Sequence, residues 1–145
     1  MHLGIDITDP AGAGLILGAP VLAVTNGEVV AITTDSSRPQ GYHISIRATD
    51  PALRDPYTQH HLIFTHMHLR HRPTLTEGAI VHRGDVIGFV GRTGSVNSDG
   101  HLHFEVANSN ATWGPDDRVT RRINPVFFYP AGSFQGTTTI WNERR

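Results

Sequence analysis

Apolar and polar residues recur along this chain with the two-residue period of β-strands. Residues 42–47 alternate, and residues 62–69 have the length and composition of a strand. Residues 79–81 and 86–90 are shorter apolar runs between glycines, whereas the Pro-, Asp- and Arg-rich residues 48–59 predict a loop. Short strands between glycine turns, without a helical period, predict an all-β fold of antiparallel β-sheets folded on each other. We expect residues 42–47 to expose one polar face to solvent.

Residues 21–32 contain a strong signal for a β-hairpin. An apolar run at residues 21–24 and a second run at residues 28–32 flank Thr25, Asn26 and Gly27. Asn-Gly is a preferred central pair of a two-residue turn, because both central positions need a positive φ. The sequence therefore predicts that these two runs pair with each other.

The chain has the length of one domain. Its 145 residues are enough to bury a hydrophobic core, and they contain neither an internal repeat nor a linker-like segment. We expect a single domain over residues 1–130. Residues 131–145 are polar and rich in turn formers, and we expect either an edge strand or a loose tail there.

Composition limits the partners and the possible chemistry. A net charge of −1 gives no electrostatic reason to expect nucleic acid as a partner. Without a stretch of about 18 apolar residues, we expect no membrane span, and the N-terminus lacks the basic and apolar segments of a signal peptide. Because the chain has no cysteine, a metal would have to be bound by His, Asp or Glu. Ten histidines, several of them close together, make a metal site the simplest explanation.

The most informative short motif is His101-Leu102-His103. On a strand its two imidazoles project to the same side, and apolar neighbours anchor the strand. Neutral imidazole is a common zinc ligand and a common proton acceptor near neutral pH. The pair could bind a metal, transfer protons or divide these tasks. A solvated strand that happens to carry two histidines is the simpler alternative.

Two further segments carry residues of the same kind. His2 and Asp6 could bind one ion, with the small Gly4 between them allowing a close backbone approach. His66 and His68 would face the same way on a regular strand, like the pair at 101 and 103. Taken alone, each spacing also fits a protein without a metal.

Together these segments resemble the lysostaphin-type (LytM-like) zinc endopeptidases, which cleave peptides of peptidoglycan. That family has His-x-x-x-Asp near the domain start, a strand similar to Tyr-x-His-Leu in the middle, and His-x-His followed by Phe-Glu. The corresponding segments here are His2-Leu-Gly-Ile-Asp6, Phe64-Thr-His66-Met67 and His101-Leu-His103-Phe-Glu. The glycine-rich residues 78–94 and Asn124-Pro125 also match, and the resemblance covers about residues 2–130.

This resemblance implies a single groove-bearing domain of the duplicated-hybrid-motif type. It also implies one Zn2+ per chain, bound by His2, Asp6 and His103, with a water in the fourth position of a catalytic site. The expected partners are peptidoglycan peptides, and the expected location is the cell wall, although this chain shows no export signal and could be a fragment or phage-encoded. We expect a monomer.

The resemblance also assigns the groups that handle protons. His101 would act as general base beside the water or would orient it. The middle histidine would donate to the oxyanion of the tetrahedral intermediate. We expect His66 in this role, because it follows an aromatic residue by two positions, with His68 as the alternative because Leu69 follows it. Phe64 takes the place of the family's usual tyrosine, so that any role of that hydroxyl is absent.

The main alternative is a domain of the same family without activity, which would bind the cell wall or activate another hydrolase. Such domains typically lose zinc ligands, whereas every ligand position is filled here, which favours an enzyme. The glycine-rich residues 12–18 resemble a dinucleotide-binding motif only faintly, and we interpret them as a turn. A cupin-like metal barrel also uses His-x-His, but its later glutamate is missing. His-Glu-x-x-His and Gly-x-Ser-x-Gly motifs are absent.

Overall fold

The computed structural model describes residues 4–9, 11, 14–94, 99–109 and 122–125 of the protein. Its strands are, in chain order, β1 (Ile5–Ile7), β2 (Pro20–Leu22), β3 (Gly27–Ile32), β4 (Tyr42–Ala48), β5 (Leu62–Leu69), β6 (Ile80–Val81), β7 (Val86–Phe89), β8 (Leu102–Asn108) and β9 (Arg122–Ile123). All of their pairings are antiparallel. The predicted all-β class of antiparallel sheets is confirmed.

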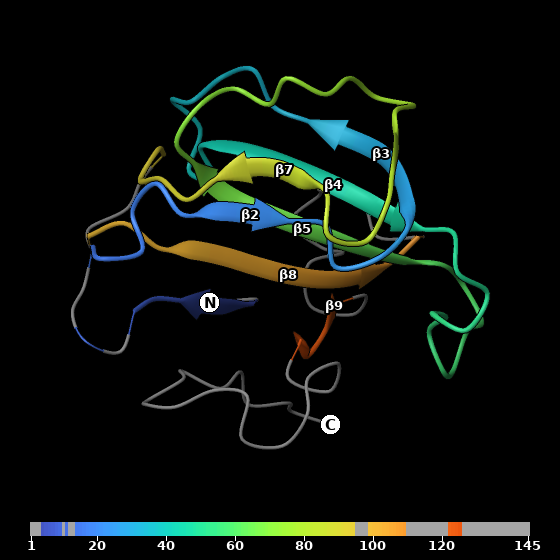
Figure 1. The fold of residues 1–145 in the computed structure, drawn as a ribbon. Helices are drawn as coiled ribbons and strands as arrows, with labels where there is room; N and C mark the ends of the chain where they lie inside the picture. Colours follow the sequence, from blue (N-terminus) through green and yellow to red (C-terminus); the bar gives the residue numbers. More distant parts are fainter. Residues whose placement is uncertain (1–3, 10, 12–13, 95–98, 110–121, 126–145) are drawn as a thin grey trace.

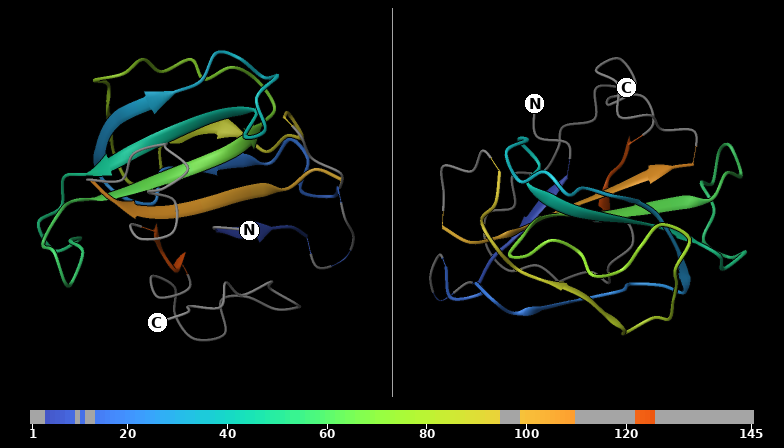
Figure 2. Two further views of the ribbon diagram at one scale, coloured as in Figure 1. Left: turned by 180° about the vertical axis from the view of Figure 1, so that it is seen from behind. Right: turned by 90° about the horizontal axis from the view of Figure 1, so that it is seen from above.

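The strands form a large sheet and a small one. The large sheet has the order β1-β8-β5-β4-β3-β6, and β2 pairs with β7 in the small sheet. The small sheet lies as a second layer over one face of the large sheet (Figures 1 and 2). Because β5 occupies one edge of β8, β1 and β9 share its other edge, β1 along residues 102–104 and β9 along residues 106–107.

The hydrophobic core lies on the face of the large sheet that the small sheet covers. Ile44 and Ile46 of β4 pack there with Val21 of β2 and Ile87 of β7, among other apolar residues. A second cluster continues the core over β5 and β8, where the rings of Phe64 and Phe104 stack with centroids 6.1 Å apart. Burial of these apolar side chains is the main force that holds the two layers together.

The opposite face of the large sheet is polar and also buried. The expectation that residues 42–47 expose a polar face is wrong, because His43 and Ser45 are only 7% and 1% exposed. The Ser45 hydroxyl is hydrogen-bonded to the Thr65 hydroxyl on the neighbouring strand at 2.8 Å. Such pairing offsets the desolvation of polar groups that are removed from water.

The predicted hairpin between residues 21–24 and 28–32 does not form. β2 pairs with β7, and β3 pairs with β4 and β6. Neither Asn26 nor Gly27 has a positive φ, which the expected turn requires. A Cβ atom at Gly27 would lie 2.5 Å from the carbonyl oxygen of Arg47. The glycine therefore allows two strands to approach closely and does not make a turn.

Other predicted elements agree with the structure. β5 has the predicted bounds, and strands occur within residues 79–81 and 86–90. The loop predicted at residues 48–59 lies between β4 and β5, except that Ala48 is the last residue of β4. Residues 131–145 lie outside the described residues, so the expected tail and the domain limit at residue 130 stay predictions.

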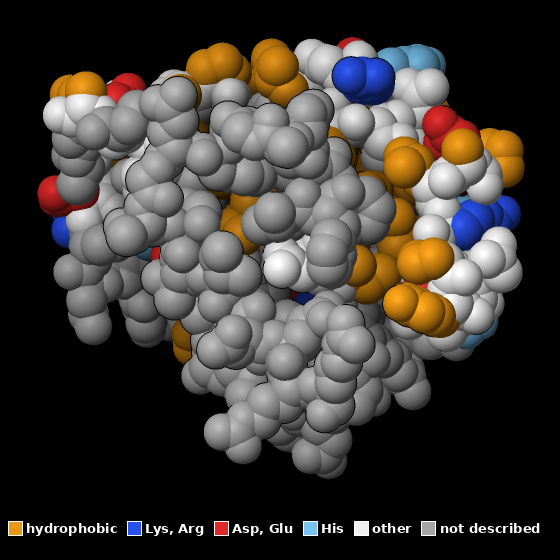
Figure 3. All heavy atoms as spheres, turned by 90° about the horizontal axis from the view of Figure 1, so that it is seen from below, with side chains coloured by type: hydrophobic (Ala, Val, Ile, Leu, Met, Phe, Trp, Pro, Cys, Tyr) orange, Lys and Arg blue, Asp and Glu red, His pale blue; other side chains and the backbone are white. Residues whose placement is uncertain are grey.

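Among the residues that the structure describes, no helix is long and apolar enough to cross a membrane. On the side shown in Figure 3, described acidic and basic side chains lie scattered between apolar ones.

Candidate active site

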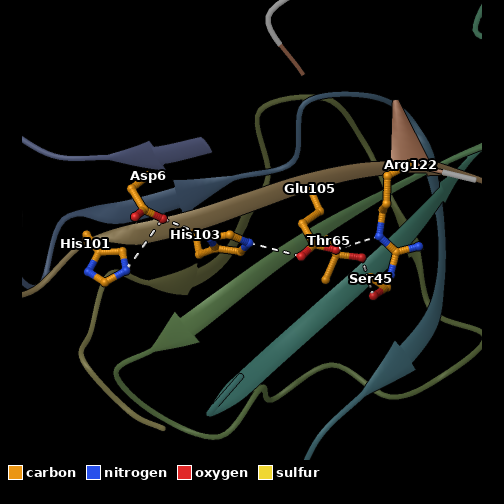
Figure 4. Close-up of polar contacts among 7 residues, drawn as sticks. All are labelled: Asp6, Ser45, Thr65, His101, His103, Glu105 and Arg122. Carbon is orange, nitrogen blue, oxygen red and sulfur yellow. Dashed lines mark hydrogen bonds and ion pairs between the residues drawn. The ribbon is translucent and has the colours of Figure 1, made fainter. Parts of the chain in front are cut away.

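A carboxylate and two imidazoles meet at the paired ends of β1 and β8. Asp6 lies opposite His103 in the register of these two strands. Its Oδ1 atom is 2.8 Å from Nδ1 of His103 and 3.7 Å from Nε2 of His101 (Figure 4). The structure thus brings together three of the predicted site residues. His2, the fourth predicted residue of this end of the site, lies outside the described residues.

Gly4 makes this approach of β1 to β8 possible. A Cβ atom at this position would lie 2.3 Å from the carbonyl oxygen of Phe104 and 3.0 Å from Nε2 of His103. Real Cβ atoms do not come so close to backbone, so any other residue here would push the two strands apart. The suggestion from sequence that Gly4 allows a close backbone approach agrees with this geometry.

A β-bulge in β5 brings a further histidine to the site. Ile44 pairs with His66 and Tyr42 with Leu69, so that two residues of β5, Met67 and His68, lie opposite one residue of β4. His68 has a φ of 61°, an uncommon conformation for a residue other than glycine. Its ring lies against those of His101 and His103, with centroids 4.9 and 5.9 Å apart.

His66 lies on the other face, in the hydrophobic core. It is 1% exposed, and its ring packs on Phe104 with centroids 5.1 Å apart. Burial lowers the pKa of His66 to about 4. The structure therefore brings His68, and not the favoured His66, to the site. The expectation that both would face the same way is wrong, because the bulge interrupts the alternation of side chains between them.

Backbone carbonyl groups fix the orientation of two site histidines. Nδ1 of His68 lies 2.8 Å from the carbonyl oxygen of Thr93, and Nδ1 of His101 lies 3.2 Å from that of Asp99. A carbonyl oxygen only accepts hydrogen bonds, so each Nδ1 carries a proton, and the neutral form of each ring has its lone pair on Nε2. Burial, together with the neighbouring His101 and His103, lowers the pKa of His68, which favours this neutral form.

His103 lies between two carboxylates. Its Nδ1 faces Asp6, and its Nε2 lies 3.0 Å from Oε1 of Glu105. Burial alone would lower the pKa of His103, but hydrogen bonds and charges of the two carboxylates raise it to about 9. Burial would likewise raise the pKa of Glu105, but its contacts with His103 and Arg122 hold it below the usual value.

The sequence did not single out Glu105, Arg122 or Thr93 as site residues. The i, i+2 spacing of His103 and Glu105 on one strand was a usable signal for the first of them. Arg122 comes from β9, and no local pattern relates it to β8.

The donor types at this site suit a zinc ion, for which His nitrogen and Asp oxygen are ordinary ligands. Asp6 and Glu105 stabilise the protonated, positively charged form of His103. The same negative charges would also attract a metal cation. No group of three or more His, Cys, Asp or Glu residues within the described ranges meets the geometry of a metal site. Asp6 and His103 would supply two ligands, and His2, the expected third, is not among the residues described.

Comparison with known proteins identifies the family. The model of peptidase family M23 matches residues 1–115 of this chain. The chain belongs to peptidase family M23. No curated protein sequence matches it significantly.

Solved structures of M23 peptidases share the fold. The catalytic domain of lysostaphin, an antimicrobial peptidase from Staphylococcus simulans, is 23% identical over 88% of this chain and 78% of its own, with a TM-score of 0.63. A variant of the catalytic domain of the prophage-encoded M23 protein EnpA from Enterococcus faecalis is 25% identical over 87% of this chain and 77% of its own, with a TM-score of 0.60. A zinc-containing peptidase from Vibrio cholerae is 27% identical over 72% of this chain and 26% of its own, with a TM-score of 0.53.

Proposed function

We propose that this M23 peptidase is a zinc-dependent endopeptidase that hydrolyses peptide bonds of peptidoglycan. The observation that carries the proposal is that Asp6 of β1, His68 of β5 and His103 of β8 meet at one place with His101, which directly precedes β8. A carboxylate and imidazoles at one place can hold a catalytic metal and transfer protons beside it, which are the two tasks of metal-assisted peptide hydrolysis. The zinc-containing relative supports the choice of metal.

In this proposal Asp6 and His103 hold the zinc together with His2. When bound, the ion would supply positive charge that acidifies a nearby water and polarises the scissile carbonyl group. His101 takes the proton of that water on Nε2, because its Nδ1 proton is engaged by the Asp99 carbonyl.

His68 would take the role that the resemblance gives to the middle histidine. Its neutral ring presents a lone pair on Nε2, because Nδ1 donates to Thr93. His68 can therefore donate to an oxyanion or to the leaving amine only after Nε2 has gained a proton. Its ring lies against that of His101 with centroids 4.9 Å apart, so the two imidazoles proposed to handle protons lie side by side.

The proposed substrate and location follow from the family and from relatives such as lysostaphin. We propose that the enzyme acts as a monomer on peptide stems or cross-bridges of the cell wall, outside the cytoplasm.

The test measures zinc content of the purified chain and release of free amines from purified peptidoglycan, with and without a chelator. We expect one zinc per chain and release that stops on chelation. His101→Ala and His68→Ala should each lower turnover by about 10²- to 10⁴-fold, the usual contribution of a general acid or base, while zinc remains bound.

His66→Leu is the matched control, because it removes a histidine of the same strand that faces the core. It should keep both zinc and turnover. Binding of the wild-type protein to peptidoglycan without amine release would contradict the proposal and favour a non-enzymatic cell-wall-binding domain. Loss of turnover in His66→Leu, with the fold and His68 intact, would contradict the assignment of His68.

A further inference from the structure

A buried row of charged groups extends from the site along β8. Nδ1 of His103 contacts Asp6, its Nε2 contacts Glu105 at 3.0 Å, and Oε2 of Glu105 accepts a hydrogen bond from Nε of Arg122 at 2.8 Å (Figure 4). The side chains of His103, Glu105 and Arg122 are each less than 10% exposed. Each of the two oxygens of Glu105 thus has its own partner.

Sheet topology explains how these residues meet. His103 and Glu105 are two positions apart on β8 and point to the same face. β1 and β9 share one edge of β8: Asp6 lies opposite His103, and Arg122 lies opposite Ala107. Arg122 is therefore the diagonal neighbour of Glu105 on the same face, within reach of a long side chain. Glu105 lies between the strand that brings Asp6 and the strand that brings Arg122.

We infer that Glu105 and Arg122 are positioning residues, which hold the His103 ring with Nδ1 directed at Asp6 and the metal. The inference rests on the zinc site of the proposed function. An ionised carboxylate only accepts hydrogen bonds, so Glu105 requires the proton on Nε2 of His103. A zinc ion would then replace the proton that Nδ1 shares with Asp6, while the proton on Nε2 stays in place.

Arg122 completes this arrangement by balancing the charge of Glu105. Its Nε donates to Oε2 of Glu105 at 2.8 Å, which fixes the carboxylate group so that Oε1 stays directed at Nε2 of His103. Arg122 also lies beyond residues 1–115, the range that the family model matches. The match to the family model therefore assigns it no role.

The exposed pair of Arg47 and Glu28 provides the matched control. It joins the same residue types across β3 and β4 at 2.8 Å, with side chains that are 41% and 33% exposed. Glu28→Gln therefore removes the same kind of contact at a place that does not touch a site histidine.

The experiment titrates zinc into the full chain against a chromophoric chelator. Glu105→Gln should weaken zinc binding about 10- to 100-fold, the usual effect of losing such a partner of a metal ligand. The reason is that an amide can accept a hydrogen bond from Nε2 or donate one to it, and so does not keep the proton on Nε2. Arg122→Leu should weaken binding in the same range, and Arg122→Lys, which keeps the charge, should restore it to within about threefold of wild type. Glu28→Gln should leave zinc binding unchanged.

A second readout needs no variant. Long-range 1H–15N spectra of the zinc-loaded wild-type protein should show His103 protonated at Nε2. Protonation at Nδ1, or a folded Glu105→Gln protein with wild-type zinc affinity, would overturn the inference while leaving the proposed function intact. A wild-type protein that binds no zinc would instead overturn the proposed metal site on which the inference depends.

Discussion

Both faces of β5 and β8 are largely buried, but they differ in the interactions that stabilise them. On the core face, Phe64 and Phe104 stack on each other and on further apolar residues. On the other face, Ser45 is hydrogen-bonded to Thr65, and Glu105 to Arg122. Apolar packing depends on volume and tolerates exchange among side chains of similar size. A buried polar face depends on donors and acceptors at fixed distances, which makes it suitable for holding catalytic groups in place.

His66 is the exception on the core face. Neither of its ring nitrogens has a hydrogen-bond partner of ordinary geometry among the described residues. His66 is therefore as buried as Phe104, but its side chain is polar like those of the opposite face. Substitutions on each face, and at His66, can test whether the two faces depend on different interactions.

The largest expected effect is on the core face. Phe104→Ala should lower the free energy of unfolding of the metal-free protein by about 3–5 kcal/mol, because it leaves a cavity between Phe64 and His66. Urea denaturation measures the change. Leu62→Met, also on the core face, keeps the side-chain volume and should cost less than about 1.5 kcal/mol. Equal losses in both variants would contradict the dependence of this face on volume.

The next effect concerns His66 in acid. Its pKa is about 4 in the folded protein against 6.5 for the ordinary group, so the unfolded chain binds the proton more tightly. This difference corresponds to about 3 kcal/mol of stability that is present above pH 6.5 and is lost as the pH falls toward 4. His66→Leu should remove this part of the acid sensitivity, measured by urea denaturation of metal-free protein at pH 4 to 7. If the free energy of unfolding of the variant and of the wild type changed in parallel with pH, the prediction would be refuted. His82→Gln serves as control, because the His82 side chain is exposed.

The smallest effect tests hydrogen bonding on the polar face. Ser45→Ala should cost about 1–2 kcal/mol, because it leaves the buried Thr65 hydroxyl without its partner. The double variant Ser45→Ala/Thr65→Val removes both hydroxyl groups and should be no less stable than Ser45→Ala alone. A double-mutant cycle in thermal unfolding measures the coupling. Additive losses would mean that the two hydroxyl groups act independently.

Features that depend on neighbouring residues could be predicted from the sequence. The bounds of β5 follow from its composition, and the placement of His101 and His103 on the same side, where both face Asp6, follows from their i, i+2 spacing. The meeting of Asp6 with His103 came from the family resemblance, since no local rule relates residues 97 positions apart.

Features that depend on distant pairing could not be predicted. Asn26-Gly27 has the residues of a turn, but the glycine is needed where β3 approaches β4. The choice between His66 and His68 depends on a bulge, which is also fixed by the hydrogen bond from the His68 amide to the Gln40 carbonyl. Arg122 reaches Glu105 only because β9 pairs beside β1 on the edge of β8.

The bulge at His68 also has a consequence for sequence alignment. An ungapped alignment of this strand with a relative that has no bulge would be correct only on one side of Met67. On the other side, it would match residues that point to opposite faces of the sheet. A gap of one residue at Met67 or His68 keeps both halves of the strand in phase. Searches for active-site histidines in strands like this one should therefore allow such a gap before judging a position filled or lost.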